Sequence, residues 1–332
     1  MYKTLVQLAE DAAILVHMIM RGNPTRLPVL TALAALVFQV VLAANGAAQA
    51  PERAKAQTFT LGIVSEIHRA QIEGHFQDFV RYVAGKLSAA PDFEGKVMIA
   101  PSAFQLARLI EQKKVDFYME SPYPTYLVNE MHGAAKLLLR RWKSGMAEYR
   151  SFIFTKNNGE VSRLEDLRGK IFVFEDPGST SGHFLAKSFL LKKGFKFADK
   201  SRFDPHGSPT AVGYVFAYSQ AKLVDMVLAK QAAAGAFSDD DYAKLDEKKK
   251  SAITILAETE RVPRHFLSVR KDFAPPLVDR IEKILRSMHE NEQGRRILKN
   301  TDDTTKFDFF PQGEAAMRRR LAEIFHSAGK NY

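Results

Sequence analysis

The chain contains no cysteine in its 332 residues. It therefore forms no disulfide and carries no lipid on an N-terminal cysteine. It also lacks a long apolar run after residue 44, so nothing later in the sequence is suited to span a bilayer. Internal repeats and low-complexity linkers are absent as well. The part after residue 50, about 280 residues, is long enough for two lobes with sizeable hydrophobic cores.

Acidic residues are fewer than basic ones, and the formal net charge is +10. Three cations and two anions lie in the first fifty residues, so the rest of the chain carries about +9. Basic chains often bind nucleic acids. Here, however, the lysines and arginines are scattered, without interleaved aromatic residues or zinc-finger spacing. This scattered distribution argues against a nucleic-acid partner, and the net positive charge favours small anionic ligands.

The first fifty residues have the order of a cleavable signal peptide. Arg21 and Arg26 precede an apolar run at residues 27–44, and the small-x-small pattern A-Q-A stands at residues 48–50. A positive region, an apolar region and a cleavage site in this order predict export. An uncleaved membrane anchor is the alternative, because the run approaches the roughly 20 residues that a bilayer needs.

The segment before Arg21 fits a signal peptide poorly, since Glu10 and Asp11 are unusual in its positive region. Translation from Met20 would give a signal of ordinary length. We assign residues 1–50 to the signal peptide and expect a soluble protein of the periplasm.

After residue 50, strand-like runs alternate with helical periodicity, which is typical of an α/β protein with mostly parallel sheets. We interpret the strand at 149–155 as a crossing into a second lobe and the strand at 266–270 as a crossing back. The predicted first lobe comprises residues 51–150 and 268–332, and the second comprises residues 151–267. The other predicted strands lie at 59–64, 97–99, 115–119, 137–139, 171–174, 212–216, 232–237 and 253–256.

Two local predictions concern helices. Residues 162–165, S-R-L-E, have the pattern of a capping box before a short helix. The chain after residue 270 is predicted to be helical, with apolar residues on one face.

Residues 176–182, D-P-G-S-T-S-G, follow the apolar strand 171–174 and open a helix-like segment at 183–193. A helix start in a loop of Gly, Ser and Thr presents unpaired N–H groups and partial positive charge, and three hydroxyls can complete a cage for oxygens. An ordinary helix N-cap is the alternative. The order is neither the G-x-S-x-G of a nucleophile elbow nor that of a lysine-containing P-loop. We interpret this STS loop (residues 176–182) as an oxyanion-binding loop without chemistry.

Three further polar clusters follow predicted strands, at Ser65, at residues 120–123 and at Ser238-Asp239. Ligands of open α/β sheets bind beyond the carboxyl ends of the strands. Two clusters fall in each predicted lobe, so a cleft between the lobes would bring all of them together.

The chain resembles the periplasmic phosphate/phosphite/phosphonate-binding proteins of ABC transporters over roughly residues 58–312. The resemblance rests on V-D-F at 115–117 with S-P-Y at 121–123, on L-E-D-L-R-G-K at 164–170, and on the STS loop. The motif G-Y-V-F at 213–216, followed by Tyr218 and Ser219, is also similar to part of this family. The resemblance implies a two-lobed type II periplasmic-binding-protein fold, each lobe a mostly parallel sheet flanked by helices, with a ligand cleft between the lobes.

The resemblance also implies roles for individual residues. Ser179, Thr180 and Ser181 would hold phosphoryl or phosphonyl oxygens, and Asp239 would accept a hydrogen bond from a P–OH group or bind an ammonium. Tyrosine and serine hydroxyls would add donors from both lobes, namely those of Ser121 and Tyr123 in the first and of Tyr218 and Ser219 in the second.

Glu120 departs from the family pattern, in which many relatives have glycine. A carboxylate in the cleft would favour a ligand that carries a proton or a cation, such as an aminoalkylphosphonate. The alternative is that Glu120 points to solvent or pairs with Arg140 or Arg141.

The favoured function is capture of a small phosphorus oxyanion (a phosphonate, phosphite or phosphate) and delivery to an inner-membrane ABC permease. The protein would act as a monomer, without catalysis, cofactor or metal. The first alternative is an oxyanion sensor that partners a membrane histidine kinase. A more distant one is a secreted serine hydrolase using Ser179 or Ser181, for which no histidine spacing provides a base.

Overall fold

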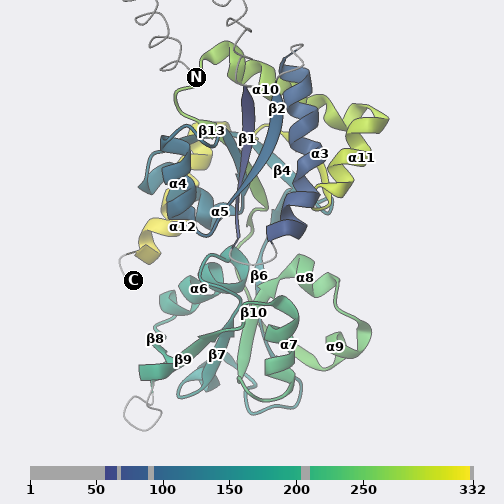
Figure 1. Ribbon diagram of the computed structural model, residues 1–332. Helices are drawn as coiled ribbons and strands as arrows, with labels where there is room; N and C mark the ends of the chain where they lie inside the picture. The colour runs from purple at the N-terminus through teal and green to yellow at the C-terminus, as the bar shows by residue number, and fades with distance from the viewer. Residues whose placement is uncertain (1–56, 66–68, 89–92, 203–209, 330–332) are drawn as a thin grey trace, which may run out of the picture. The chain divides into compact units, whose positions relative to one another are not determined.

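The computed structural model describes residues 57–65, 69–88, 93–202 and 210–329 (Figure 1). The predicted signal peptide, the start at Met20 and the cleavage site before Pro51 lie outside these residues. In the part of the chain that is described, no helix combines the length and the apolar character needed to cross a membrane.

The first sheet has six strands in the order β14-β4-β13-β3-β1-β2. Strand β1 pairs in parallel with β2 and β3, whereas β13 runs antiparallel to β3 and β4. Strand β1 is buried along most of its length, as expected of a strand covered on both faces. The strands are β1 (Thr58–Val64), β2 (Glu94–Ala100), β3 (Phe117–Glu120), β4 (Ala135–Lys143), β13 (His265–Arg270) and β14 (Thr304–Asp308).

The second sheet also has six strands, in the order β11-β6-β10-β7-β9-β8. Strands β10, β7, β9 and β8 are mutually parallel, and β6 is antiparallel to β10 and β11. The strands are β6 (Ser151–Lys156), β7 (Ile171–Phe174), β8 (Lys196–Asp199), β9 (Ala211–Phe216), β10 (Ala234–Ser238) and β11 (Ile253–Glu258).

The chain crosses between the two sheets twice. It leaves the first sheet after β4 through β5 (Glu148–Tyr149), and it returns after β11 through β12 (Val262–Pro263). These two short strands pair antiparallel, with Val262 opposite Tyr149. Strand β13 lies in the first sheet and straddles the predicted lobe boundary between residues 267 and 268.

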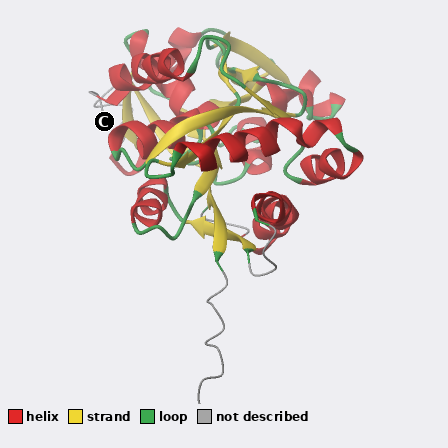
Figure 2. Ribbon diagram, turned by 90° about the horizontal axis from the view of Figure 1, so that it is seen from above, coloured by secondary structure: helices red, strands yellow, loops and turns green. Residues whose placement is uncertain are grey.

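Helices lie on both sides of the strands in the view from above (Figure 2). Their starts follow local rules, because Ser102 caps α4 with a hydrogen bond from Gln105 N and two prolines open α10. The helices are α3 (Arg69–Leu87), α4 (Ala103–Glu111), α5 (Pro122–Tyr126), α6 (Ala186–Lys192), α7 (Gln220–Leu228), α8 (Asp239–Ala243), α9 (Glu247–Ser251), α10 (Pro275–Ser287), α11 (Glu292–Asn300) and α12 (Glu314–Gly329).

Three local predictions were wrong. The chain after residue 270 is not all helical, because β14 adds an edge strand to the first sheet. The predicted capping box uses Asp166 rather than Glu165: its carboxylate accepts from Ser162 N at 3.0 Å and from Arg163 N at 3.1 Å, before a short 3₁₀ helix. The helix after the STS loop begins earlier, at Thr180, and its first turn is π-helical.

Candidate functional site

A cavity of about 590 Å³ lies where loops from the two sheets meet. In the first sheet its walls follow β1, β2 and β3, and in the second they follow β7, β9 and β10. These are the carboxyl ends of parallel strands, where α/β proteins bind ligands. Residues at the two crossings, Lys143, Tyr149, Arg264 and His265, complete the wall.

The STS loop forms a tight turn after β7, and its last three residues begin the helix that starts at Thr180. Ser179 caps this helix, since its Oγ accepts a hydrogen bond from Gly182 N at 2.9 Å. The same hydroxyl donates to Glu175 Oε2 at 2.8 Å. A Cβ atom at Gly182 would lie 2.6 Å from both Cβ and Oε2 of Glu175, so only glycine allows this packing.

Thr180 joins the two lobes. Its Oγ1 lies 2.9 Å from Ser121 Oγ and accepts a hydrogen bond from Tyr123 N at 2.9 Å. The ring of Tyr123 stacks on Phe184 of the second lobe, with centroids 4.3 Å apart. The lobes are therefore in direct contact beside the cavity.

Two carboxyl groups on facing lobes are held in unusual environments. Glu120 accepts a hydrogen bond from Val64 N at 2.6 Å through Oε1. Burial raises the pKa of Glu120 to about 7. Burial, followed by the neighbouring Asp241, also raises the pKa of Glu175 to about 7. Each carboxyl is thus partly protonated near neutral pH and can either accept from a ligand or donate to it.

Cationic groups occupy the end of the cavity near the crossings. Arg264 pairs with Asp240 at 3.1 Å, and its guanidinium lies over the ring of Tyr149 at 4.4 Å. Lys143 Nζ pairs with Asp302 at 2.7 Å. His265 stays neutral, because burial and then the Arg141 charge hold its pKa well below the usual value.

Eight of the ten residues proposed from the sequence line this one cavity. Ser219 instead caps α7, accepting from Lys222 N at 3.4 Å. Asp239 pairs with Arg261 at 3.3 Å and accepts from Arg150 N. The structure brings neither of them to the cavity, and Asp241 lies there instead. The eight are Ser65, Glu120, Ser121, Tyr123, Ser179, Thr180, Ser181 and Tyr218.

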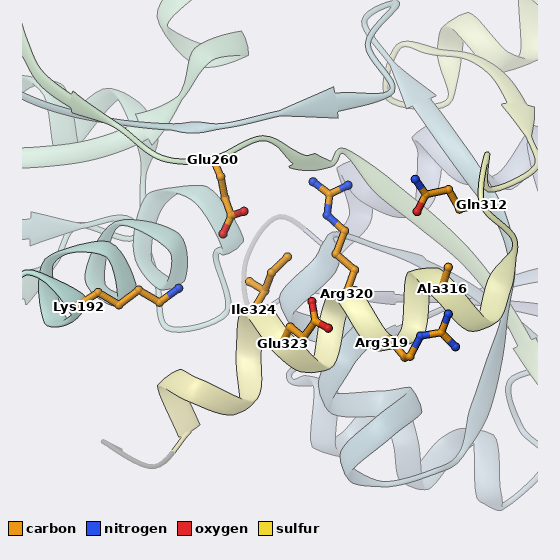
Figure 3. A pocket seen from close by; sticks show the side chains of 8 residues that line it. All are labelled: Lys192, Glu260, Gln312, Ala316, Arg319, Arg320, Glu323 and Ile324. Atoms are coloured by element: carbon orange, nitrogen blue, oxygen red, sulfur yellow. The ribbon is translucent and has the colours of Figure 1, made fainter.

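A second cavity, of about 470 Å³, lies on another part of the surface (Figure 3). Lys192 of α6 stands on one side of it, and α12 forms the other side with Arg319 and Arg320. Arg320 is already engaged, because its Nη2 donates to the carbonyl oxygen of Arg261 at 2.6 Å. None of the residues proposed from the sequence lines this groove, so we place the candidate site in the cavity of the STS loop.

The comparisons with known proteins agree with this fold. Residues 61–309 match the profile of a family described as "ABC transporter, phosphonate, periplasmic substrate-binding protein". The chain belongs to this phosphonate-binding family. The resemblance and the two-lobed α/β fold predicted from the sequence are thereby confirmed. Members of the family are the substrate-binding components of ABC transporters. A search of curated proteins gave no match.

Solved structures show the same fold at low sequence identity. XAC2383 from Xanthomonas citri, bound to ATP, is 24% identical, with a TM-score of 0.72 over 82% of this chain and 98% of that one. Its chloride-bound form gives a TM-score of 0.73. PhnD1 from Prochlorococcus marinus, in complex with methylphosphonate, is 15% identical, with a TM-score of 0.62 over 83% of this chain and 99% of that one.

Proposed function

We propose that the protein captures a small phosphorus oxyanion (a phosphonate, phosphite or phosphate) in this cavity and delivers it to an ABC permease. The observation that carries the proposal is the helix start at Thr180, which opens on the cavity beside the hydroxyls of Ser179 and Ser181. The first N–H groups of a helix have no partner within the helix and attract anions. The methylphosphonate complex of PhnD1, a protein of the same fold, supports this ligand class.

The two raised carboxyl pKa values bear on the form of the ligand. A fully ionised oxyanion beside Glu120 and Glu175 would be repelled whenever those groups are ionised. A ligand that retains a P–OH proton, or that carries an ammonium group, avoids this repulsion. Asp241 and Asp176 in the same wall add to this preference.

The contacts of the Ser179 hydroxyl and of His183 favour binding without catalysis. The Ser179 hydroxyl donates to the Glu175 carboxyl. His183, the histidine nearest in sequence, contacts the Pro177 carbonyl through Nδ1 at 3.1 Å. Burial lowers the pKa of His183 to about 4. These contacts do not form the serine–histidine pair that a hydrolase would need.

The ligand class can be tested directly. Native mass spectrometry of protein purified from the periplasm should reveal a bound phosphorus compound. Calorimetric titration with phosphate, phosphite and methylphosphonate should then show saturable binding of at least one of them. The absence of binding to every phosphorus compound, with an unrelated ligand in the native preparation, would refute the proposal.

Export is part of the same proposal. Secreted protein should begin at or near Pro51, which N-terminal sequencing of periplasmic material measures. Retention of residues 21–44 in the mature protein would indicate a membrane-anchored form. Either result leaves the ligand test valid, because every residue that lines the cavity lies after residue 56.

A further inference from the structure

Two large apolar side chains that are open to solvent line the cavity. Phe104 is 49% exposed and Tyr218 is 48% exposed. Among the described residues, the other exposed large hydrophobic side chains are Met131 and Phe309, and neither lines this cavity. Exposed aromatic rings in a ligand cavity indicate a contact that is made when the ligand is present.

Strand order gives the two rings corresponding positions in the two lobes. Phe104 lies in the first turn of α4, directly after β2, and Tyr218 lies directly after β9. Strand β2 is the outer neighbour of β1, as β9 is of β7, and the STS loop follows β7. Both rings therefore lie one strand farther from the crossings than the STS loop does.

Both residues are held by contacts of their own, Phe104 through its ring and Tyr218 through its backbone. The Phe104 ring meets His132 edge-on at 5.2 Å and lies 5.2 Å from the Arg108 guanidinium. Tyr218 has a left-handed backbone, with φ of 55°, which a bulky residue rarely adopts. Its N–H donates to the carbonyl oxygen of Glu175 at 2.7 Å, which holds this conformation. A strained residue in a ligand cavity suggests a role in binding.

The size of the cavity points the same way. At about 590 Å³ it lies within the range of about 300–1,000 Å³ that is typical of cavities for drug-sized ligands. A bare oxyanion on the STS loop would leave most of this cavity empty, and Phe104 and Tyr218 both line it.

We propose that the physiological ligand carries a planar aromatic ring, held between Phe104 and Tyr218, while its phosphonyl or phosphoryl group lies on the STS loop. This inference rests on the proposed function and narrows it to aryl or heteroaryl phosphorus compounds. Aromatic side chains bind a planar ring by stacking on its faces. His132 meets Phe104 edge-on rather than stacking on it, so Phe104 can stack on a ligand ring.

The test compares phenylphosphonate with methylphosphonate and cyclohexylphosphonate by calorimetry. Phenylphosphonate should bind roughly tenfold more tightly than methylphosphonate, given the strength of ring stacking. Cyclohexylphosphonate should fall clearly below phenylphosphonate, because it lacks a planar face. Adenosine monophosphate, compared with ribose 5-phosphate, tests whether the ring is a nucleobase rather than an aryl group.

Four variants assign the effect to the two rings. Phe104→Leu and Tyr218→Leu should each remove most of the phenyl advantage, whereas Tyr218→Phe should keep it. Phe309→Leu is the matched control, since Phe309 is equally exposed, at 48%, but lies outside the cavity. Its phenyl advantage should equal that of the wild type.

The outcomes separate the two proposals. Binding of methylphosphonate with no gain for either the phenyl or the nucleobase compound overturns the aromatic ring and leaves the oxyanion function standing. Equal affinity for phenyl and cyclohexyl compounds also overturns it, because the contact would then be merely apolar. Failure of every phosphorus compound to bind refutes both proposals.

Discussion

At the scale of single residues, Thr180 occupies two roles that compete. Its hydroxyl bridges Ser121 and Tyr123 across the lobes, yet it stands at the helix start that we propose binds the oxyanion. A ligand oxygen arriving there would accept from the Thr180 hydroxyl in place of Ser121, and a charged acceptor makes the stronger hydrogen bond. The contact with Ser121 would then be lost, and the hydrogen bond from Tyr123 N would remain to join the lobes.

Two serine caps provide a matched test of the STS loop. On ligand binding the Ser179 hydroxyl would turn from Glu175 to the oxyanion. Ser179→Ala should therefore weaken oxyanion binding by roughly 1.5–3 kcal/mol, the range for hydrogen bonds to charged groups. Ser219→Ala removes a similar N-cap outside the cavity and should leave affinity unchanged. Both should lower stability by only ~1 kcal/mol. Titration calorimetry and thermal unfolding of the pair measure the two effects, and equal affinities in both variants would support an ordinary cap at Ser179.

Glu120 should influence which ligand binds best. If its carboxylate meets a ligand cation, Glu120→Gln will reduce affinity for 2-aminoethylphosphonate and leave or improve affinity for phosphate and methylphosphonate. A thermal-shift panel of these compounds on both proteins gives the ranking. An unaltered ranking would place Glu120 outside the contacts with the ligand.

The pH dependence of stability offers an independent check on Glu120. Its pKa in the folded protein is raised to about 7 from 4.5, so the folded state holds this proton more tightly than the unfolded state. The resulting stabilisation is complete below pH 4.5 and is lost as the pH rises through 7. The melting temperature of the wild type should therefore fall between pH 5 and 8. Glu120→Gln should show a smaller fall, with the remainder due to Glu175, and identical slopes would contradict the shift.

The sequence identified the polar loops that follow the strands, but not the cationic residues at the crossings. Ser65, Ser121 and the STS loop follow predicted strands and carry recognisable motifs, so their convergence could be predicted from topology. Lys143 and Arg264 could not be chosen from 48 lysines and arginines. They reach the cavity only because β5 and β12 pair at the crossings, which is a contact between distant segments without a local signal.

At the scale of elements, the edge strand β14 depends on one buried cation. Arg141 on β4 is 1% exposed, and its Nε donates to Thr304 Oγ1 at 2.8 Å. Its Nη2 donates to the carbonyl oxygens of Thr301 and Asp302, each at 3.1 Å. This arrangement explains why β14 escaped prediction, since a short polar segment becomes a strand through a partner more than 160 residues away in sequence.

Arg141→Lys should destabilise the protein by about 2–3 kcal/mol, because lysine cannot make these divergent hydrogen bonds and leaves buried acceptors unpaired. Arg318→Lys is the control. Like Arg141, Arg318 donates through Nε and Nη2, here to the carboxylate of Glu130, but it lies on the exposed surface. Its loss should stay below about 1 kcal/mol. Urea unfolding compares them, and equal losses would show that Arg141 does not anchor β14.

At the scale of the whole molecule, the α/β class and the two-lobed fold followed from alternating patterns and from the family resemblance. The extent of each lobe depends on where the chain crosses, and β5 and β12 are too short to stand out in the sequence. The division into lobes at residues 150 and 267 stays a prediction.

The groove of Figure 3 offers a way to test whether the lobes move when a ligand binds. Lys192 belongs to a helix of the second lobe, and Arg319 to α12, whose Phe325 contacts Phe184 across the lobes at 4.6 Å. Both positions are exposed, and the chain has no cysteine of its own. Cysteines introduced at 192 and 319 would therefore accept spectroscopic labels at those two sites alone. The distance between the labels, measured with and without ligand, would show whether the two lobes change their separation at this groove.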